Sequence, residues 1–433
     1  MDRVIRIGLL GCGTVGGGVV TLLSGEVEDI TVRTGARLQI HRIAVRDLDK
    51  ARRRGLPVAD EVFTTDAAGV VEDPEVDVVV EVMGGLDPAG GLVRRALELG
   101  KPVVTANKEL VADAGPELYE AARSAGVDLA YEAAVAGAIP IIRPLKESLA
   151  GDRVRRVVGI LNGTTNYILT RMSEEGADYA TVLADAQALG YAEADPTADV
   201  GGHDAAAKCA ILASLAFDTV VHANDVFREG IDGVTPTDLR VADRLGYVVK
   251  LVGIAGETDD KIGVRVHPVF LPKAHPLASV RDAFNAVYVE AEAAGELMFY
   301  GRGAGAMPTA SAVAGDVVDV ARNLLQTARG ATESVHRAKA IRPIEDLQTQ
   351  YYVLLDVDDE AGVLADVART FGDHRVSIAQ VWQEGAGDSA QLVLITHRAR
   401  EGDLQATVGA LAAMADVRSV ASVLRVESEG FSS

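Results

Sequence analysis

The chain has few cysteines and no long apolar run. Its 433 residues include only two cysteines, Cys12 and Cys209, whose positions form neither a metal-binding spacing nor a disulfide framework. No apolar stretch reaches the length of a membrane span. The first residues, MDRVIRIGLLGCG, lack the layout of a secretory signal. These absences predict a cytoplasmic protein with reduced thiols and no membrane partner.

Basic residues are also scarce relative to acids. Lysine and arginine number 42 against 63 aspartates and glutamates, which gives a formal net charge of -21. Such a chain repels polyanions, so nucleic acid and anionic membranes are excluded as partners. The 48% apolar and 24% charged residues are ordinary for a soluble globular protein. The length indicates about three domains.

Short apolar runs alternate with helical patterns in the first third of the chain. This alternation is typical of a doubly wound parallel sheet of the Rossmann type, in the α/β class. Within it, the apolar runs that we expect to be strands are 4–10, 39–45, 77–82, 102–105 and 127–131.

A glycine-rich turn follows the first expected strand and opens a helical pattern. It reads G-C-G-T-V-G, and its members are Gly11, Gly13, Thr14, Val15 and Gly16. In this context the glycines permit a tight turn and a close backbone approach to a diphosphate, and the helix start offers free N–H groups. We therefore predict a dinucleotide site, with a purely structural glycine turn as the alternative.

The end of the second expected strand carries a mixed signal for cofactor choice. A carboxylate at this place holds the ribose hydroxyl of NAD, and an arginine accepts the 2′-phosphate of NADP. Both types are present, as Arg46 and Asp47. Because Arg46 comes first, NADP(H) is the preferred prediction and NAD(H) stays possible; the alternative for Arg46 is a solvated loop residue. The preceding segment SGEVEDITVRTGA is interpreted as an inserted connection, since the spacing from Gly16 is long.

A lysine lies just past the fourth expected strand, in Thr105-Ala106-Asn107-Lys108. The carboxyl ends of such strands line the ligand crevice. Lys108 is therefore expected to meet cofactor or substrate. The alternative is a surface lysine in the first turn of a helix, where a cation is slightly unfavourable.

The segment GYAEADPTADVGGHDAAAK concentrates acids before a single lysine. Glu193, Asp195, Asp199 and Asp204 are followed by Lys208, four residues beyond the last acid. A helix opening at Asp204 would place Asp204 and Lys208 on one face. This set suits a small cationic substrate and a proton donor. The alternative is a solvated acidic loop with an ordinary ion pair.

The rest of the chain predicts two further parts. A mixed α/β domain for substrate binding and dimerisation is followed by a polar linker and a βαββαβ tail of the ferredoxin-like kind. The expected boundaries are 1–133 for the dinucleotide domain, 134–323 for the second domain (whose last helix, about 308–323, can return to the first), 324–349 for the linker and 350–433 for the tail.

Taken together, these residues resemble the homoserine dehydrogenase family, in its longer bacterial form with a regulatory tail. The resemblance covers essentially the whole chain and rests on GLLGCGTVGGGV, EVMGG, VTANKEL, YEAAVAGAIPII, GILNGTTNYIL, GYAEADPTADVGGHDAAAK and GRGAGAMPTASAV. It implies interconversion of aspartate semialdehyde and homoserine with a nicotinamide cofactor, in the biosynthesis of threonine, methionine and isoleucine.

The resemblance also assigns residue roles. Lys208 becomes the general acid and base, with Asp204 and Lys108 as the other catalytic residues. The residues that it places at the substrate are Glu193, Asp204, Asp199, Tyr191 and Thr164. Besides the glycine turn and Arg46, the residues that it places at the cofactor are Gly84, Thr105, Lys108, Gly190, Gly303 and Gly305.

A monovalent-cation loop is implied at 132–140. By resemblance, a sodium ion binds Glu132 and the carbonyls of Val135, Gly137 and Ile139. One carboxylate among small residues suits a hard cation with oxygen ligands. The alternative is a tight crossover between domains.

The tail resembles an ACT domain, a small-molecule sensor of amino-acid biosynthetic enzymes. Its first loop, DDEAGVL, matches the ligand loop, with Ala361 where proline is common. We expect threonine as effector and a homo-oligomer, dimer or tetramer; the alternative is a dimerisation module without ligand. Two other interpretations of the chain are a phosphorylating semialdehyde dehydrogenase, which needs a nucleophilic cysteine, and a non-catalytic nucleotide-sensing regulator.

Overall fold

The computed structural model describes residues 3–331, 338–385 and 389–427. Residues 332–337 of the predicted linker lie outside this part. The chain divides into two compact units, each built from three segments. Unit 1 comprises Met1–Val157, Ala207–Asp225 and Phe284–Ala338, and unit 2 comprises Val158–Ala206, Val226–Ala283 and Lys339–Ser433.

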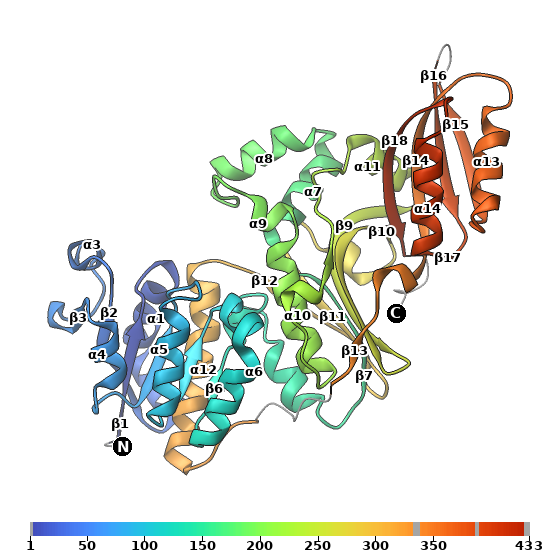
Figure 1. The fold of residues 1–433 in the computed structure, drawn as a ribbon. Helices are drawn as coiled ribbons and strands as arrows, with labels where there is room; N and C mark the ends of the chain where they lie inside the picture. Colours follow the sequence, from blue (N-terminus) through green and yellow to red (C-terminus); the bar gives the residue numbers. More distant parts are fainter. Residues whose placement is uncertain (1–2, 332–337, 386–388, 428–433) are drawn as a thin grey trace. The chain divides into compact units, whose positions relative to one another are not determined.

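Unit 1 contains the expected parallel sheet (Figure 1). Its neighbouring strands all pair in parallel. The central strand β4 is buried along its whole length, as a parallel sheet covered on both faces requires. The Rossmann-type prediction is confirmed. In sheet order the strands are β3 (Phe63–Thr64), β2 (Arg37–Ala44), β1 (Val4–Leu10), β4 (Val78–Glu81), β5 (Val103–Thr105) and β6 (Leu129–Ala130).

Helices cover this sheet, and a late helix joins them. The apolar side of α12 belongs to the same core as β1 and α1. Helices α1 and α12 approach each other closely, because a side chain at Gly18 would place its Cβ 2.8 Å from the Cβ of Ala310. The segment SGEVEDITVRTGA, interpreted as an inserted connection, contains helix α2. The helices of this region are α1 (Thr14–Gly25), α2 (Val27–Thr34), α3 (Leu48–Arg52), α4 (Ala67–Glu72), α5 (Ala89–Glu98), α6 (Lys108–Ala125) and α12 (Ala306–Gln326).

Unit 1 also holds an antiparallel hairpin, β11 (Phe284–Ala291) and β12 (Gly295–Arg302). The sequence did not predict β12, because its side chains are mostly half-exposed and show no clean alternation. Two elements contribute to both units, β7 (Val154–Ile160) and helix α10 (His203–Ala216).

Unit 2 contains a mixed sheet and the ferredoxin-like tail. Its strand order is β9-β10-β18-β14-β16-β15. The tail has the expected βαββαβ order, which confirms that prediction. The strands are β9 (Tyr247–Thr258), β10 (Lys261–Pro272), β14 (Gln348–Asp358), β15 (Ile378–Glu384), β16 (Ser389–Thr396) and β18 (Val417–Val426). The helices are α7 (Gly163–Glu175), α8 (Tyr179–Ala188), α9 (Thr197–Val200), α11 (Pro236–Arg244), α13 (Val363–Asp373) and α14 (Glu401–Ala412).

The tail is more firmly attached than a tethered module would be. Strand β18 pairs in parallel with β10, through Val269–Arg425 and Phe270–Val426. The hydroxyl of Tyr352 donates a hydrogen bond of 2.9 Å to the buried Asp238. The tail therefore shares a sheet and a buried polar contact with the rest of unit 2. Among the described residues, no helix has both the length and the apolar character needed to cross a membrane.

Candidate active site

The glycine turn between β1 and α1 has the geometry of a phosphate-binding turn. Gly11 has a φ of 96°, and a Cβ at Gly16 would lie 2.3 Å from the Gly11 carbonyl oxygen. Only glycine satisfies both requirements. Gly13 and Thr14 are exposed, and no side chain caps the start of α1. The first turn of α1 thus offers uncapped backbone N–H groups, which suit an anion.

Two further segments approach this turn and the helix that follows it. A Cβ at Gly11 would lie 3.0 Å from Met83, next to Gly84, and one at Gly18 would lie 3.0 Å from the carbonyl oxygen of Ala306. The segment from Gly303 to Gly305 leads directly into that first turn of α12. The residues next to Gly84 and Gly305 therefore approach the glycine turn and α1.

An arginine that the sequence did not single out also lies on this turn. The guanidinium of Arg54 donates a hydrogen bond to the carbonyl of Cys12, and a Cβ at Gly17 would lie 3.4 Å from it. Arg54 follows α3, ten residues beyond the end of β2. Sequence spacing gave no signal that it would reach back to the glycines.

A buried polar network supports the ends of β4 and β5. The carboxylate of Glu81 accepts hydrogen bonds from the N–H groups of Met83 and Gly84, at 2.7 and 3.1 Å, and from the Thr105 hydroxyl at 2.6 Å. Asn107 caps α6 and donates 2.6 Å to the Gly85 carbonyl. The hydroxyl of Thr105 is thus engaged in holding this edge of the sheet. Neither Glu81 nor Asn107 was singled out from the sequence.

Lys108 and Arg46 lie at the carboxyl edge of the same sheet. Lys108 is the first residue of α6 and is half-buried, directly after the Asn107 cap. Arg46 is exposed after β2. Asp47 accepts a 2.9 Å hydrogen bond from the Lys50 N–H, so it caps α3. The structure thereby gives Asp47 a structural use and leaves Arg46 presented to solvent.

In unit 2, an asparagine joins two of the predicted substrate acids. The side-chain amide of Asn162 donates to Asp199 at 2.7 Å and to Asp204 at 2.9 Å. Its carbonyl oxygen accepts from the Thr165 N–H, which caps α7. Residues 162–165 therefore form the cap and the first turn of α7. One fixed amide sets the separation of two carboxylates.

The other predicted substrate residues of unit 2 lie around the loop between α8 and α9. The Thr164 hydroxyl donates 2.7 Å to the Tyr191 carbonyl, and the rings of Tyr167 and Tyr191 are 4.9 Å apart. Tyr191 and Glu193 are exposed, and Gly190 has a φ of 77°. Tyr191 and Glu193 are therefore presented on a loop that Thr164 fixes at one point.

Asp195, the second acid of the segment, has a local use. Asp195 accepts hydrogen bonds from the N–H and the hydroxyl of Thr197, at 3.1 and 2.6 Å. These bonds hold the pKa of Asp195 below its usual value. Asp195 therefore shapes the loop before α9 and is distinct from the Asn162-linked pair.

Helix α10 carries the expected acid and lysine one turn apart. Asp204 lies in its first turn and is half-buried, and Lys208 follows with 8% of its surface exposed. A buried ammonium group on the face below a carboxylate is a proton donor with restricted access to water. Spacing alone could predict the shared face but not the burial.

The predicted cation loop is organised by Glu132. Its carboxylate accepts hydrogen bonds from the N–H groups of Ile141, Ile142 and Arg143, at 2.6, 2.7 and 3.0 Å. Its own N–H donates 2.8 Å to Asp316 of α12. A cation at this carboxylate would share it with three amides. Val135, Gly137 and Ile139 are buried beside it, and a Cβ at Gly137 would lie 2.4 Å from the Gly303 carbonyl oxygen.

The cysteines do not support nucleophilic chemistry. Both are buried, and neither takes part in a disulfide. Burial raises the pKa of the Cys12 thiol, even though Arg54 lies close. A buried thiol with a raised pKa carries little thiolate, so a phosphorylating dehydrogenase would have no nucleophile here.

A parallel sheet with a glycine turn at its carboxyl edge, together with a buried lysine one helical turn from a carboxylate, is an arrangement expected of an NAD(P)-dependent oxidoreductase. Comparison with known families agrees. Residues 11–132 match "Homoserine dehydrogenase, NAD binding domain", residues 140–318 match "Homoserine dehydrogenase", and residues 351–416 match "ACT domain".

Relatives extend over the full chain. The homoserine dehydrogenase of Mycobacterium tuberculosis is 51% identical over 440 residues, covering 99% of each chain. That of Corynebacterium glutamicum is 49% identical over 428 residues, covering 98% of this chain and 96% of its own. The crystal structure of a homoserine dehydrogenase from Thiobacillus denitrificans superposes with a TM-score of 0.93 at 42% identity, covering 99% of both chains.

A more distant solved structure is a hyperthermophilic archaeal homoserine dehydrogenase in complex with NADPH. It has a TM-score of 0.63 at 28% identity and covers 73% of this chain and 98% of its own. The chain belongs to the homoserine dehydrogenase family. It is an enzyme of amino-acid biosynthesis that interconverts aspartate semialdehyde and homoserine, and the regulator without activity is set aside.

Proposed function

We propose that Lys208 is the proton donor and acceptor of this reaction. When bound, the reduced nicotinamide supplies a hydride to the aldehyde carbon of aspartate semialdehyde. The Lys208 ammonium then gives its proton to the aldehyde oxygen, which completes the alcohol of homoserine and leaves a neutral amine. In the reverse direction the amine takes that proton back. The observation that carries this role is the buried Lys208 one turn from Asp204 on α10.

The acids hold the substrate in this proposal. Asp199 and Asp204, kept together by Asn162, bind the substrate's ammonium group through charge-assisted hydrogen bonds. Glu193 and Tyr191 contact the substrate from the exposed loop, and Thr164 holds that loop by its hydrogen bond to the Tyr191 carbonyl. Holding the amino acid by its fixed end orients the carbon that accepts the hydride.

For the cofactor, NADP(H) is the preferred form. The residues fit a dinucleotide, because α1 begins without a side-chain cap at the exposed Gly13 and Thr14, and a Cβ at Gly13 would meet no atom within 4 Å. Arg46 accepts the 2′-phosphate, since Asp47 is used to cap α3. Lys108 lies close to the nicotinamide and substrate. A relative solved with NADPH supports this choice. Gly84, Gly190, Gly303, Gly305 and the backbone near Thr105 line the remaining cofactor surface.

A sodium ion at the Glu132 loop is part of the proposal. The backbone carbonyls of Val135, Gly137 and Ile139 supply hard oxygen ligands. Because the Glu132 carboxylate already accepts three amide hydrogen bonds, its share of the coordination is expected to be small. The ion's role is to fix the loop next to α12.

Regulation is assigned to the tail, with threonine as the effector. Helix α13 starts at Gly362 without a side-chain cap, so its first N–H groups can receive an amino acid's carboxylate. Contacts within unit 2 connect the tail to the segment that carries the acids. The guanidinium of Arg425 on β18 donates a 2.6 Å hydrogen bond to Glu229, and the nearby Ile231 N–H donates to the carbonyl of Val200 in α9.

Assembly and compartment complete the proposal. Strand β15 ends the unit 2 sheet, with Val381 42% exposed, so it can pair with the same strand of a second copy. The proposal also includes a homo-oligomer and a reducing cytoplasm, with which two cysteines outside any disulfide are consistent. The proposal keeps the boundaries 1–133, 134–323, 324–349 and 350–433 for cofactor, substrate, linker and regulatory segments.

The experiment that tests the proposed roles is oxidation of NADPH by the purified enzyme with aspartate semialdehyde, without phosphate. Lys208→Ala should abolish most turnover while homoserine still protects the protein against thermal unfolding. If turnover survives, Lys208 is not the proton donor.

Threonine sensitivity needs a point variant, because removing the tail would also break the β18–β10 pairing. Ala361→Glu places a carboxylate at the start of α13, where it would compete with the effector. It should abolish inhibition by threonine, and Ala368→Glu, exposed on the same helix, should keep it. Inhibition that persists in Ala361→Glu would place threonine elsewhere.

A further inference from the structure

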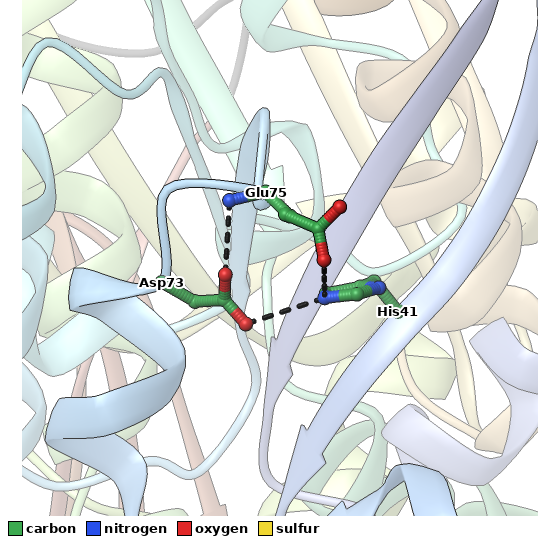
Figure 2. A group of neighbouring side chains, drawn as sticks. All are labelled: His41, Asp73 and Glu75. Carbon is green, nitrogen blue, oxygen red and sulfur yellow. Dashed lines mark hydrogen bonds and ion pairs between the residues drawn. The ribbon is translucent and has the colours of Figure 1, made fainter.

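A histidine of the parallel sheet and two carboxylates of a nearby turn meet in unit 1, and no role has been assigned to any of them above. His41 comes from β2, and Asp73 and Glu75 come from the turn between α4 and β4 (Figure 2). All three belong to unit 1. The Nε2 atom of His41 lies 3.2 Å from Asp73 Oδ2 and 3.8 Å from Glu75 Oε2. One atom from each residue lies within 4.8 Å of the other two.

We propose that these residues form a site for one zinc-like divalent transition metal ion, bound by His41 Nε2, Asp73 Oδ2 and Glu75 Oε2, with water as fourth ligand. An imidazole and two carboxylates are an ordinary donor set for such an ion. With metal–ligand distances near 2.0 Å, the ligands of a tetrahedral ion lie about 3.3 Å apart. The separations of 3.2 and 3.8 Å are close to that spacing before any metal is added.

A bulge in strand β2 places His41 next to the two carboxylates. Along β2, Ile40 pairs with Ile7 and Arg42 pairs with Gly8, so His41 is the extra residue of a bulge. A bulge redirects a side chain that regular pairing would send elsewhere. The imidazole of His41 thereby faces the α4–β4 turn, with its Nε2 between both carboxylates (Figure 2).

The turn that carries the two carboxylates is itself fixed. The ammonium group of Lys101 donates to the carbonyls of Val71 and Asp73, at 2.6 and 2.5 Å. The second oxygen of Asp73, Oδ1, accepts the Glu75 N–H at 2.9 Å. This leaves Oδ2 directed at the histidine. A ligand atom that is oriented by a second interaction loses little entropy on binding a metal.

Two arginines lie near the carboxylates of this cluster and would compete with a metal ion for them. Arg42 Nε lies 3.9 Å from Asp73 Oδ2, and Arg6 lies 3.9 Å from Glu75 Oε1. Both are long contacts on the surface, which are worth little. Arg6 also meets the Glu75 oxygen that the metal does not use. A bound metal would therefore replace the His41–Asp73 hydrogen bond and one weak arginine contact, and it would join β2 to the α4–β4 turn.

The test is a titration of the EDTA-treated full-length enzyme with zinc chloride, followed by calorimetry, and with cobalt chloride, followed by the visible spectrum of tetrahedral cobalt. We expect one equivalent to bind and to raise the unfolding temperature. His41→Gln and Glu75→Gln should each weaken binding at least about tenfold, since even an indirect ligand partner costs that much. His222→Gln removes an exposed histidine of the same unit and should change nothing.

Two results would overturn the proposal. One is stoichiometric zinc binding that His41→Gln and Glu75→Gln leave unchanged. The other is no zinc binding at all, with His41→Gln lowering stability equally with and without metal; the cluster would then be an ion pair only. Dehydrogenase activity is not the readout, so this test is independent of the active-site assignments.

Discussion

The cofactor turn and the substrate acids are built in different ways. The turn is fixed by backbone, with Gly11 and Gly16 in close contact and the fully buried Glu81 supporting the adjacent loop. The acids proposed to hold the substrate are side chains near the surface, and Asn162 links two of them. A backbone site tolerates the loss of single side chains, whereas a site made of a few charged groups does not. Single substitutions should therefore affect the substrate side more.

The largest effect is expected at Lys208, because both the forward and the reverse reaction need proton transfer by this residue. Lys208→Ala should lower kcat by roughly two to four orders of magnitude, the usual contribution of a positioned general acid. The KM for homoserine should change much less. Steady-state kinetics in both directions, with circular dichroism to show the fold, measure this. Near-normal turnover in a folded variant would remove Lys208 from the mechanism.

The next effect tests the acids linked by Asn162. Asp204→Asn keeps the shape and an acceptor for Asn162 but removes a charge. Losing a charge-assisted hydrogen bond to an ammonium group should raise the homoserine KM by roughly ten to a hundredfold. The KM for NADPH should stay the same.

Asp195 offers a matched control, since it is an acid of the same segment whose oxygens bind Thr197. Asp195→Asn should leave the homoserine KM within about twofold, as expected of a surface substitution of roughly half a kcal/mol or less. Equal effects of the two variants would mean that general negative charge, and not the Asn162-linked pair, holds the substrate.

A smaller effect is expected on the cofactor side, because the backbone carries most of that binding. Arg46→Ala should weaken NADPH about tenfold through loss of one charge-assisted phosphate contact. NADH should be unaffected. Arg33→Ala, an exposed arginine of α2, controls for net charge. Equal losses for both cofactors would show that Arg46 does not read the 2′-phosphate.

The sequence predicted the backbone side of this comparison well. A glycine turn after an apolar run has few folded solutions, so the spacing of Gly11, Gly13 and Gly16 was enough to place them at the start of α1. The side-chain supports were not foreseen, because Glu81, Arg54 and Asn162 act through partners up to 42 residues away along the chain. No local pattern encodes such contacts.

The attachment of the tail was missed for a similar reason. The polar stretch before Gln350 predicted a linker, and strand β9 was not foreseen. Strand β18 meets β10 across more than 150 residues of sequence, through Val269 and Arg425. Long-range strand pairing depends on which edges remain available after folding, and a single sequence does not state that.

The smallest effect concerns Lys250, a buried lysine that contacts helix α7. Lys250 of β9 is 4% exposed, and its ammonium group donates to Asn166 Oδ1 at 2.9 Å and to the Val280 carbonyl at 2.5 Å. Asn166 lies in α7, the helix that Asn162 caps. Burial lowers the pKa of Lys250 to about 8. Lys250 thus supports α7 while its charge opposes folding.

The sign of the pH dependence follows from this lowered pKa. Above pH 8 the folded chain has lost the Lys250 proton, while the unfolded chain keeps it up to the ordinary value near 10.5, so stability gains with rising pH in that window. Relative to Lys250→Met, the wild-type free energy of unfolding should rise by about 1 kcal/mol between pH 8 and 9. Denaturant unfolding at pH 7, 8 and 9 measures it, with Lys273→Met as an exposed-lysine control. Parallel pH curves for wild type and Lys250→Met would mean that Lys250 keeps its ordinary pKa, and the support of α7 would then come from a charged lysine that water still reaches.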